Sequence, residues 1–254
     1  MTILHQSPIF GPVKSRRLGI SLGINVMPGD GKWCSFDCVY CECGWNQPVS
    51  HPVLPTRKQV SEALTSQLST LNTPLDVITF SGNGEPTLHP EFLGIIEDTC
   101  ALRDQYCPNA KISVLSNSTQ LGRPEVIEAL RLCDNRILKL DSAIDATMQL
   151  IDQPVNPNLT VEQIAQWLSL FEGDFTLQTC FLRGEYHGQI IDNTTPAELS
   201  AWYAMIKRLH PKQVMIYVID RATPLQTLSK VPASEMEAIA EPLRQQGIDV
   251  IVCA

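Results

Sequence analysis

Long apolar runs and an export signal are both missing from this 254-residue chain. Its longest apolar stretch, around Leu18 to Met27, is shorter than the roughly 20 residues that cross a bilayer, and glycine and serine interrupt it. The first ten residues carry no basic segment followed by an apolar core, so they lack the pattern of a secretory signal. We therefore expect a cytoplasmic protein with no membrane partner.

Positive charge is also scarce. The chain has 19 lysines and arginines against 27 acidic residues, which gives a formal net charge of -8. An acidic protein repels nucleic acid and anionic membranes unless a local basic patch attracts them. The charge therefore favours a small molecule, a peptide or a protein as the substrate over nucleic acid.

Internal repeats, low-complexity tracts and long linkers are absent as well, and strand-like segments alternate with helix-like ones instead. With 44% hydrophobic residues the chain can bury one large core, so we expect a single domain over residues 1–254. Continuous aliphatic runs predict strands buried on both faces at 19–26, 76–81, 111–117, 137–141, 175–182, 213–219 and 249–253. The 3.6-residue spacing predicts helices around 60–71, 92–100, 126–130, 160–171, 195–209 and 232–247.

Six strand-helix units with parallel connections form either an open doubly wound sheet or an incomplete barrel, and the pattern fits both. In each architecture, ligands bind at the carboxyl ends of the strands. Functional residues are therefore expected where the strands end, at Ser81, Asn117, Asp141, Arg183 and Asp220.

The nine cysteines include three, Cys34, Cys38 and Cys41, that lie within eight residues with the spacing C-x3-C-x2-C. This cluster fits metal ligation in a reducing compartment better than a disulfide framework. Structural zinc takes four protein ligands, whereas an iron-sulfur cluster held by three cysteines leaves one iron open to an external ligand. The spacing therefore favours an iron-sulfur cluster with an open coordination position.

Cys43 leaves an alternative open, because it could join the three cysteines in a four-thiolate site. Such a site would make the protein an iron-sulfur electron carrier or a zinc-stabilised binding module. The single residue between Cys41 and Cys43 strains simultaneous ligation of one metal, which weighs against this alternative.

The cysteine motif is followed in register by Gly82-Asn83-Gly84-Glu85-Pro86, and the two together resemble the radical S-adenosylmethionine (SAM) superfamily. In that family a Gly-Gly-Glu-Pro motif contacts the SAM amino group, and here Asn83 replaces the first glycine. The stretches 11–19 and 81–90 look like a branch related to the enzymes of tRNA wyosine synthesis. The chain is also similar in size to glycyl-radical activating enzymes.

The resemblance implies an α/β fold, an incomplete (βα)6 barrel with parallel strands and outer helices, in which the cluster loop follows the first strand. It implies that Cys34, Cys38 and Cys41 hold a [4Fe-4S] cluster that cleaves SAM reductively, so that a 5'-deoxyadenosyl radical abstracts hydrogen from a substrate. A flavodoxin or ferredoxin is the implied electron donor. The implied SAM-binding residues are Tyr40, Gly82, Asn83, Gly84, Glu85, Pro86, Asn117, Asp141 and Arg183, with Thr179 and Phe181 beside them.

Several of these residues also have a purely structural interpretation. Asn117 and Asp141 could cap the segments that follow them, since Asn and Asp commonly begin loops. Arg183 could be a solvated ion-pair residue, and Tyr40 could be core packing.

The motifs leave the substrate open among a glycyl-radical protein, a tRNA base, and a small molecule or peptide. Acidic charge and short length weigh against the tRNA base. Four charged residues, Arg16, Arg17, Asp220 and Arg221, are candidates for the neighbourhood of the substrate.

Overall fold

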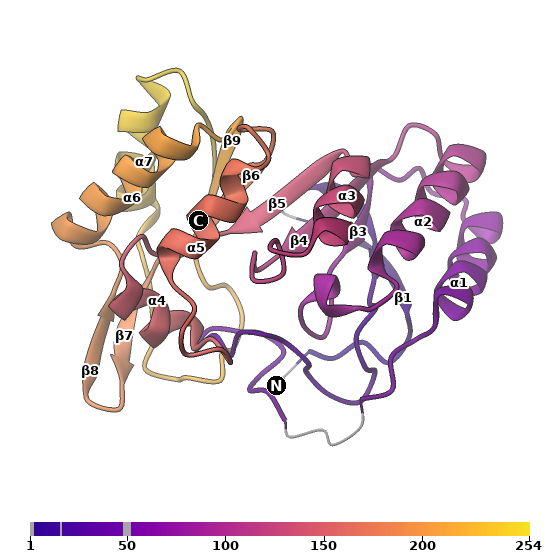
Figure 1. Cartoon of the computed structure of the whole chain (residues 1–254), viewed down its shortest axis with the longest axis horizontal. Coiled ribbons are helices and arrows are strands. Elements are labelled where there is room, and N and C mark those ends of the chain that lie inside the picture. The colour runs from indigo at the N-terminus through magenta and orange to yellow at the C-terminus, as the bar shows by residue number, and fades with distance from the viewer. Residues whose placement is uncertain (1–2, 16, 48–51) are drawn as a thin grey trace. The chain divides into compact units, whose positions relative to one another are not determined.

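The structure is a computed structural model that describes residues 3–15, 17–47 and 52–254. These residues form two compact units, which we call the N-terminal unit (3–35 and 46–137) and the C-terminal unit (36–45 and 138–254). Their helices and strands are drawn in Figure 1. The single domain expected over residues 1–254 stays a prediction. Among the described residues, no helix is long and apolar enough to cross a membrane.

A mostly parallel sheet lies at the centre of the N-terminal unit. Its strands, in spatial order, are β1 (Ile9–Ser15), β2 (Gly19–Ile24), β3 (Val77–Phe80) and β4 (Lys111–Ser116). β1 is antiparallel to β2, and the other neighbours are parallel. Ile24 lies beside Phe80 in the register and Phe80 beside Val114, and all three are fully buried. β2 and β3 therefore end level with each other, and β4 continues two residues further at the same edge.

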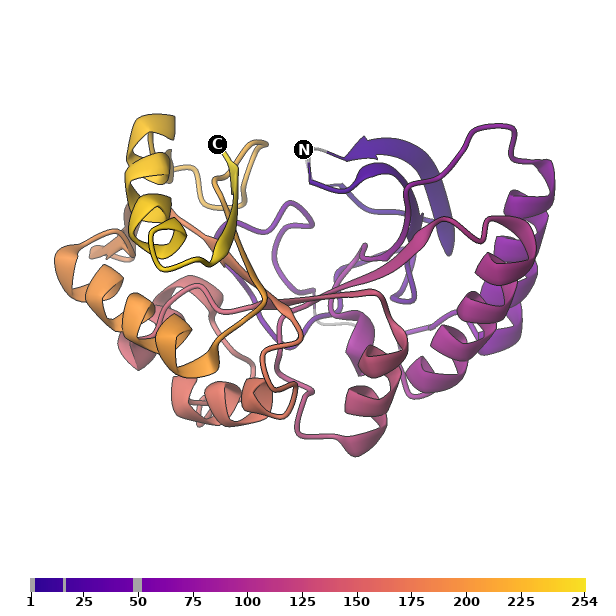
Figure 2. The same ribbon diagram turned by 90° about the horizontal axis from the view of Figure 1, so that it is seen from above.

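The helices of this unit are α1 (Arg57–Thr70), the 3-10 turn η1 (Pro86–Leu88), α2 (Phe92–Tyr106) and α3 (Pro124–Leu132). α1 begins with a capping box in which Thr56 and Gln59 exchange hydrogen bonds, and it buries Val60, Leu64 and Leu68. α2 packs against both α1 and α3. Figure 2 shows the three α-helices along one side of the sheet.

β5 (Asn135–Lys139) leads from one unit into the other, with the boundary between Ile137 and Leu138. In the C-terminal unit the strands β6 (Thr176–Cys180), β9 (Gln213–Tyr217) and β11 (Asp249–Cys253) are parallel and adjacent in that order. A small antiparallel sheet contains β10 (Ser229–Lys230), β7 (Leu182–Tyr186) and β8 (Gln189–Asp192). The helices are α4 (Asp145–Asp152), α5 (Val161–Ser169), α6 (Pro196–Leu209) and α7 (Ala233–Arg244).

Every helix and strand predicted from the sequence is present within a few residues of its expected position. Thr160 and Gln163 form the predicted capping box of α5, and Thr195 caps α6 ahead of Pro196. Gly247, after α7, has φ +80°, the left-handed conformation expected of a terminating glycine.

The sequence prediction lacks β1, the 3-10 turn η1, α4 and the small antiparallel sheet. The strand predicted at 175–182 is in fact two strands, because β6 ends at Cys180 and β7 begins at Leu182. The buried amide of Asn193 holds this break, since its Oδ1 accepts from Leu182 N at 3.0 Å and its Nδ2 donates to Cys180 O at 2.8 Å. A side chain eleven residues downstream thus ends a strand that the apolar pattern continues.

Candidate functional site

The cysteine motif is divided between the two units. Cys34 belongs to the N-terminal unit, whereas Cys38 and Cys41 belong to the C-terminal unit. All three are described and none of them is in a disulfide. Each unit therefore carries its own part of the motif.

In the N-terminal unit, backbone pairing joins the start of the cysteine motif to the Gly82–Pro86 loop. Trp33 N donates to Asn83 O at 2.8 Å, and Glu85 N donates to Trp33 O at 3.3 Å. Gly84 lies between these two bonds with φ +153°, and a Cβ built on it would be 1.8 Å from Trp33 O. Only glycine fits this close approach, so the loop sequence is required by the backbone that precedes Cys34.

Asn83, which replaces the first family glycine, is fully buried and acts as a cross-link. Its Nδ2 donates to His5 O at 2.8 Å and to Pro28 O at 2.7 Å, while its backbone N–H donates to Asn25 Oδ1 at 3.0 Å. The amide therefore holds the segments before and after β2 to the loop after β3. Its expected contact with SAM stays a prediction.

Glu85 is buried and caps η1. Its carboxylate accepts from Thr87 N at 3.1 Å, Ser116 Oγ at 2.9 Å and Asn117 N at 2.6 Å. Burial raises the pKa of Glu85 above its ordinary value, and these hydrogen bonds oppose that effect because they favour the ionised form. The carboxylate thus fixes the loop after β4 against the loop after β3.

Asn117 reaches the first cysteine. Its Nδ2 donates to Cys34 Sγ at 3.4 Å and to Ser35 Oγ at 3.0 Å, and its Oδ1 accepts from Thr119 Oγ1 at 2.8 Å. Ser35 and Thr119 also share a hydrogen bond of 2.6 Å. The sequence places Asn117 at a strand end but carries no signal for Ser35 or Thr119 as its partners.

In the C-terminal unit, the second cysteine lies against a buried lysine. Lys139 Nζ donates to Cys38 Sγ at 3.0 Å, forms an ion pair with Asp141 Oδ2 at 3.1 Å and contacts Asp152 Oδ1. Burial acts to lower the pKa of Lys139, but the two carboxylates outweigh it and raise the pKa well above its ordinary value. The ammonium ion therefore persists inside the protein.

Sequence reasoning missed both Lys139 and Asp152. A signal for the lysine exists, because Lys139 interrupts the apolar run from Ile137 to Leu140 in a strand predicted to be buried. A buried lysine needs a partner charge, and Asp141 two residues later faces the same side of a strand. The sequence carries no such signal for Asp152, because this residue lies at the end of α4, a helix that the sequence did not predict.

Both carboxylate oxygens of Asp141 accept hydrogen bonds. Tyr40 donates its hydroxyl to Oδ2, and Cys180 N donates to Oδ1 at 2.8 Å. Burial, with the charge of Asp141, raises the pKa of Tyr40 well above its ordinary value. Tyr217 donates to the Tyr40 hydroxyl at 3.4 Å, so hydrogen bonds connect Tyr217, Tyr40 and Asp141 in series.

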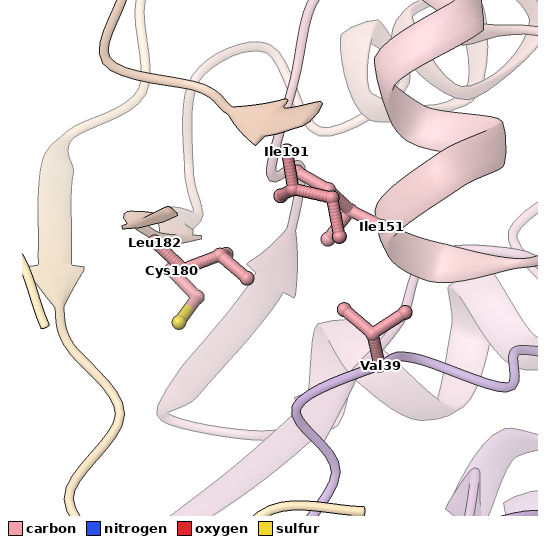
Figure 3. Close-up of a cluster of buried hydrophobic side chains, with 5 residues drawn as sticks. All are labelled: Val39, Ile151, Cys180, Leu182 and Ile191. Carbon is pink, nitrogen blue, oxygen red and sulfur yellow. The ribbon is translucent and has the colours of Figure 1, made fainter. Parts of the chain in front are cut away.

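The motif residues 36–45 are held by backbone contacts. Val39 N donates to Ile151 O and Asp37 N to Asp152 O, both at 2.9 Å, so the end of α4 fixes this segment. Val39 also enters the apolar cluster of Figure 3 with Ile151, Cys180, Leu182 and Ile191. The unpredicted elements α4, β7 and β8 therefore support the second half of the cysteine motif.

Three further candidate residues, Arg183, Asp220 and Arg221, form ion pairs. Arg183 pairs with Glu235 and with Asp192 at 3.3 Å, the contact that its structural interpretation predicts. Its expected SAM contact stays a prediction, and so does that of Tyr40. Asp220 pairs with Lys230 at 3.2 Å, and Arg221 pairs with Glu42 at 2.6 Å.

Arg16 lies outside the described residues. Thr179 and Phe181 are fully buried in packing. The Thr179 hydroxyl donates to Leu140 O at 2.7 Å and accepts from Trp202 Nε1 at 2.9 Å, and the ring of Phe181 packs edge-on against Trp202. Both side chains therefore belong to the core of the C-terminal unit.

The donor set fits an iron-sulfur cluster in its chemistry. Two of the three motif sulfurs accept N–H hydrogen bonds inside their own units, from Asn117 and from Lys139, and such bonds stabilise thiolate ligands. Within the described part of the chain, no three His, Cys, Asp or Glu side chains already gather as a metal site.

Comparison with known proteins gives a sequence match to the Radical SAM superfamily over residues 30–177. The matched range contains the three motif cysteines, Tyr40, the Gly82–Pro86 loop, Asn117 and Asp141, whereas Arg183 lies beyond it. A UPF0026 protein of Helicobacter pylori is 30% identical over 217 residues, which cover 84% of this chain and 66% of the relative. The UPF0026 protein slr1464 of Synechocystis is 34% identical over 226 residues, 86% of this chain and 77% of the relative.

Among solved structures, TYW1 with a lysine-pyruvate adduct bound has a TM-score of 0.64 at 15% identity, covering 89% of this chain and 73% of that chain. A likeness at this identity shows the fold, so the predicted α/β partial barrel with outer helices is confirmed as the fold class. This chain spans just under two thirds of the Helicobacter relative's length.

Proposed function

Because this chain belongs to the radical SAM superfamily, we propose that Cys34, Cys38 and Cys41 hold a [4Fe-4S] cluster and that the protein is an enzyme that cleaves SAM reductively. When bound, the cluster supplies an electron to the SAM sulfonium, which releases methionine and a 5'-deoxyadenosyl radical able to abstract hydrogen. The observation that carries the proposal is the family match over residues that include all three cysteines and the Gly82–Pro86 loop.

The chain's own residues would bind and orient SAM. The Gly82–Pro86 loop, Asn117 and Asp141 follow the ends of β3, β4 and β5, where α/β proteins bind ligands. Glu85 and Asn117 are fixed to each other by a hydrogen bond, and the two oxygens of Asp141 are fixed by Tyr40 and Cys180. These contacts preorganise the candidate SAM-binding groups before any ligand arrives.

The substrate that we propose is a small molecule, a peptide or a protein. Support comes from the formal net charge of -8, which disfavours nucleic acid. The similarity to TYW1 is a similarity of fold and adds no preference for tRNA. A flavodoxin or ferredoxin as the reductant and a cytoplasmic location stay predictions.

Anaerobic reconstitution with iron and sulfide tests the proposal directly. We expect about four irons and four labile sulfides per chain, and release of 5'-deoxyadenosine when dithionite and SAM are added. Zinc without labile sulfide would refute the cluster and leave the zinc-stabilised module. A cluster whose spectrum does not respond to SAM would instead support the alternative that the protein is an iron-sulfur electron carrier.

A further inference from the structure

Lys139 places a positive charge directly against one sulfur of the cysteine motif, that of Cys38. Its Nζ is 3.0 Å from Cys38 Sγ, and both side chains are buried. The corresponding donor to Cys34 is the neutral amide of Asn117, at the longer distance of 3.4 Å. The two sulfurs therefore have partners of different charge.

The surroundings of Lys139 keep this ammonium ion in place. Asp141 and Asp152 pair with it from two segments, the loop after β5 and the end of α4. The rings of Phe36 and Tyr40 lie 4.9 and 5.0 Å from Nζ, at a distance suited to cation-π contact. Two of these four groups are carboxylates from outside the cysteine motif, so the cation is held independently of any metal.

A cation beside a ligand sulfur changes how easily a cluster accepts an electron. Reduction adds negative charge to the cluster and its thiolates, and hydrogen bonds to those sulfurs raise the reduction potential. A charged donor acts more strongly than a neutral one, especially where water is excluded. Lys139 combines the charge, the short distance and the burial that this effect requires.

We propose that Lys139 is a positioning residue that stabilises the Cys38 thiolate and raises the reduction potential of the cluster. This inference rests on the proposed function, because it requires a cluster on Cys38. Asp141 and Asp152 serve it by holding the ammonium group toward the sulfur. In this role Lys139 acts through the Cys38 sulfur.

Redox titration of the reconstituted protein, followed by the electron paramagnetic resonance signal of the reduced cluster, tests this inference. Lys139→Met alone would bury two carboxylates without their cation, so the informative variant is Lys139→Met with Asp152→Asn. We expect its ratio of reduced to oxidised cluster at a fixed potential to fall about tenfold, a shift of ~59 mV for one electron. Asp152→Asn alone keeps the ammonium group and is the matched control.

Lys139→Arg should restore most of the potential, because it keeps the charge and an N–H donor. A double variant that holds its cluster at the wild-type potential would refute the inference while the proposed function stands. If the double variant loses its cluster, Lys139→Gln with Asp152→Asn decides, since an unchanged potential there also refutes the role of the charge. Failure of the wild-type protein to bind iron and sulfide would instead refute the proposed function.

Discussion

The carboxylate of Glu85 and the backbone N–H of Asn117 are joined by a hydrogen bond of 2.6 Å between residues 32 positions apart. Glu85 Oε1 meanwhile accepts from Thr87 and Ser116, so both oxygens face donors. One buried side chain therefore connects η1, β4 and the loop that reaches Cys34. Replacing this carboxylate should therefore change the stability of the protein.

Glu85→Gln should destabilise the N-terminal unit by about 1–3 kcal/mol, because either orientation of the new amide points its NH2 group at a backbone N–H. Urea denaturation followed by circular dichroism measures this loss. Glu97→Gln, at an exposed ion pair with Arg57, should change the free energy of unfolding by no more than about 0.5 kcal/mol. Equal effects of the two substitutions would contradict the buried role of Glu85.

Gly84→Ala should separate the cysteine motif from the Gly82–Pro86 loop, because the new methyl group would meet Trp33 O. We expect a loss of about 1–3 kcal/mol from this overlap in addition to the cost of the unfavourable φ. Gly188→Ala is the control for a methyl group added at a positive φ, since Gly188 has φ +77° and no atom within 4 Å of its added Cβ. Chemical denaturation measures the loss in both variants, and the loss for Gly84→Ala should be the larger.

Cys43→Ala should leave the iron and labile sulfide content at the wild-type level, whereas Cys34→Ala, Cys38→Ala and Cys41→Ala should each abolish it. The reason is that three thiolates suffice for a cluster with one open iron. Iron and sulfide assays after anaerobic reconstitution provide the measurement. Loss of iron in the Cys43 variant would favour the four-thiolate alternative.

Asp152 should make stability depend on pH. Burial raises its pKa from 3.8 to about 7, so the folded state binds this proton more tightly than the unfolded state. The resulting contribution to stability is present below about pH 4 and is lost as the pH rises through about 7. Asp152→Asn removes this contribution, so the difference in free energy of unfolding between wild type and variant should change steadily over that range.

Urea denaturation at several pH values between about 4 and about 8 measures that difference. Gln149→Ala, on the same helix, is the control because neither residue titrates. Its difference from wild type should stay constant with pH. A constant difference for Asp152→Asn as well would show that the carboxyl group titrates alike in the folded and unfolded chain.

The sequence predicted helices and strands correctly where a local sequence signal and the burial of the same residues agree. Apolar runs located the parallel strands, and the Thr160 and Thr195 caps located the starts of α5 and α6. The cysteine spacing and the Gly82–Pro86 loop identified the family that the comparison then confirmed. Each of these signals lies within a few consecutive residues.

The parts that sequence reasoning missed depend on contacts between distant residues. β1 contains Gly11 and Pro12, which are unusual in strands, and only its pairing with β2 makes it one. α4 has only eight residues and no side-chain cap, and the carbonyl groups at its end hold the cysteine motif. Lys139 contacts Cys38, 101 positions earlier in the chain. No local pattern encodes these partners.

The hydrogen bonds from Asp37 and Val39 to the end of α4 have a consequence for assembly. Folding of the C-terminal unit already removes the backbone freedom of the residues around Cys38, at a cost of roughly 1–2 kcal/mol for each residue ordered. Binding of the proposed cluster would not bear that entropy loss again, so its affinity would be higher than for a flexible segment with the same cysteines. Cluster insertion would then follow folding instead of driving it.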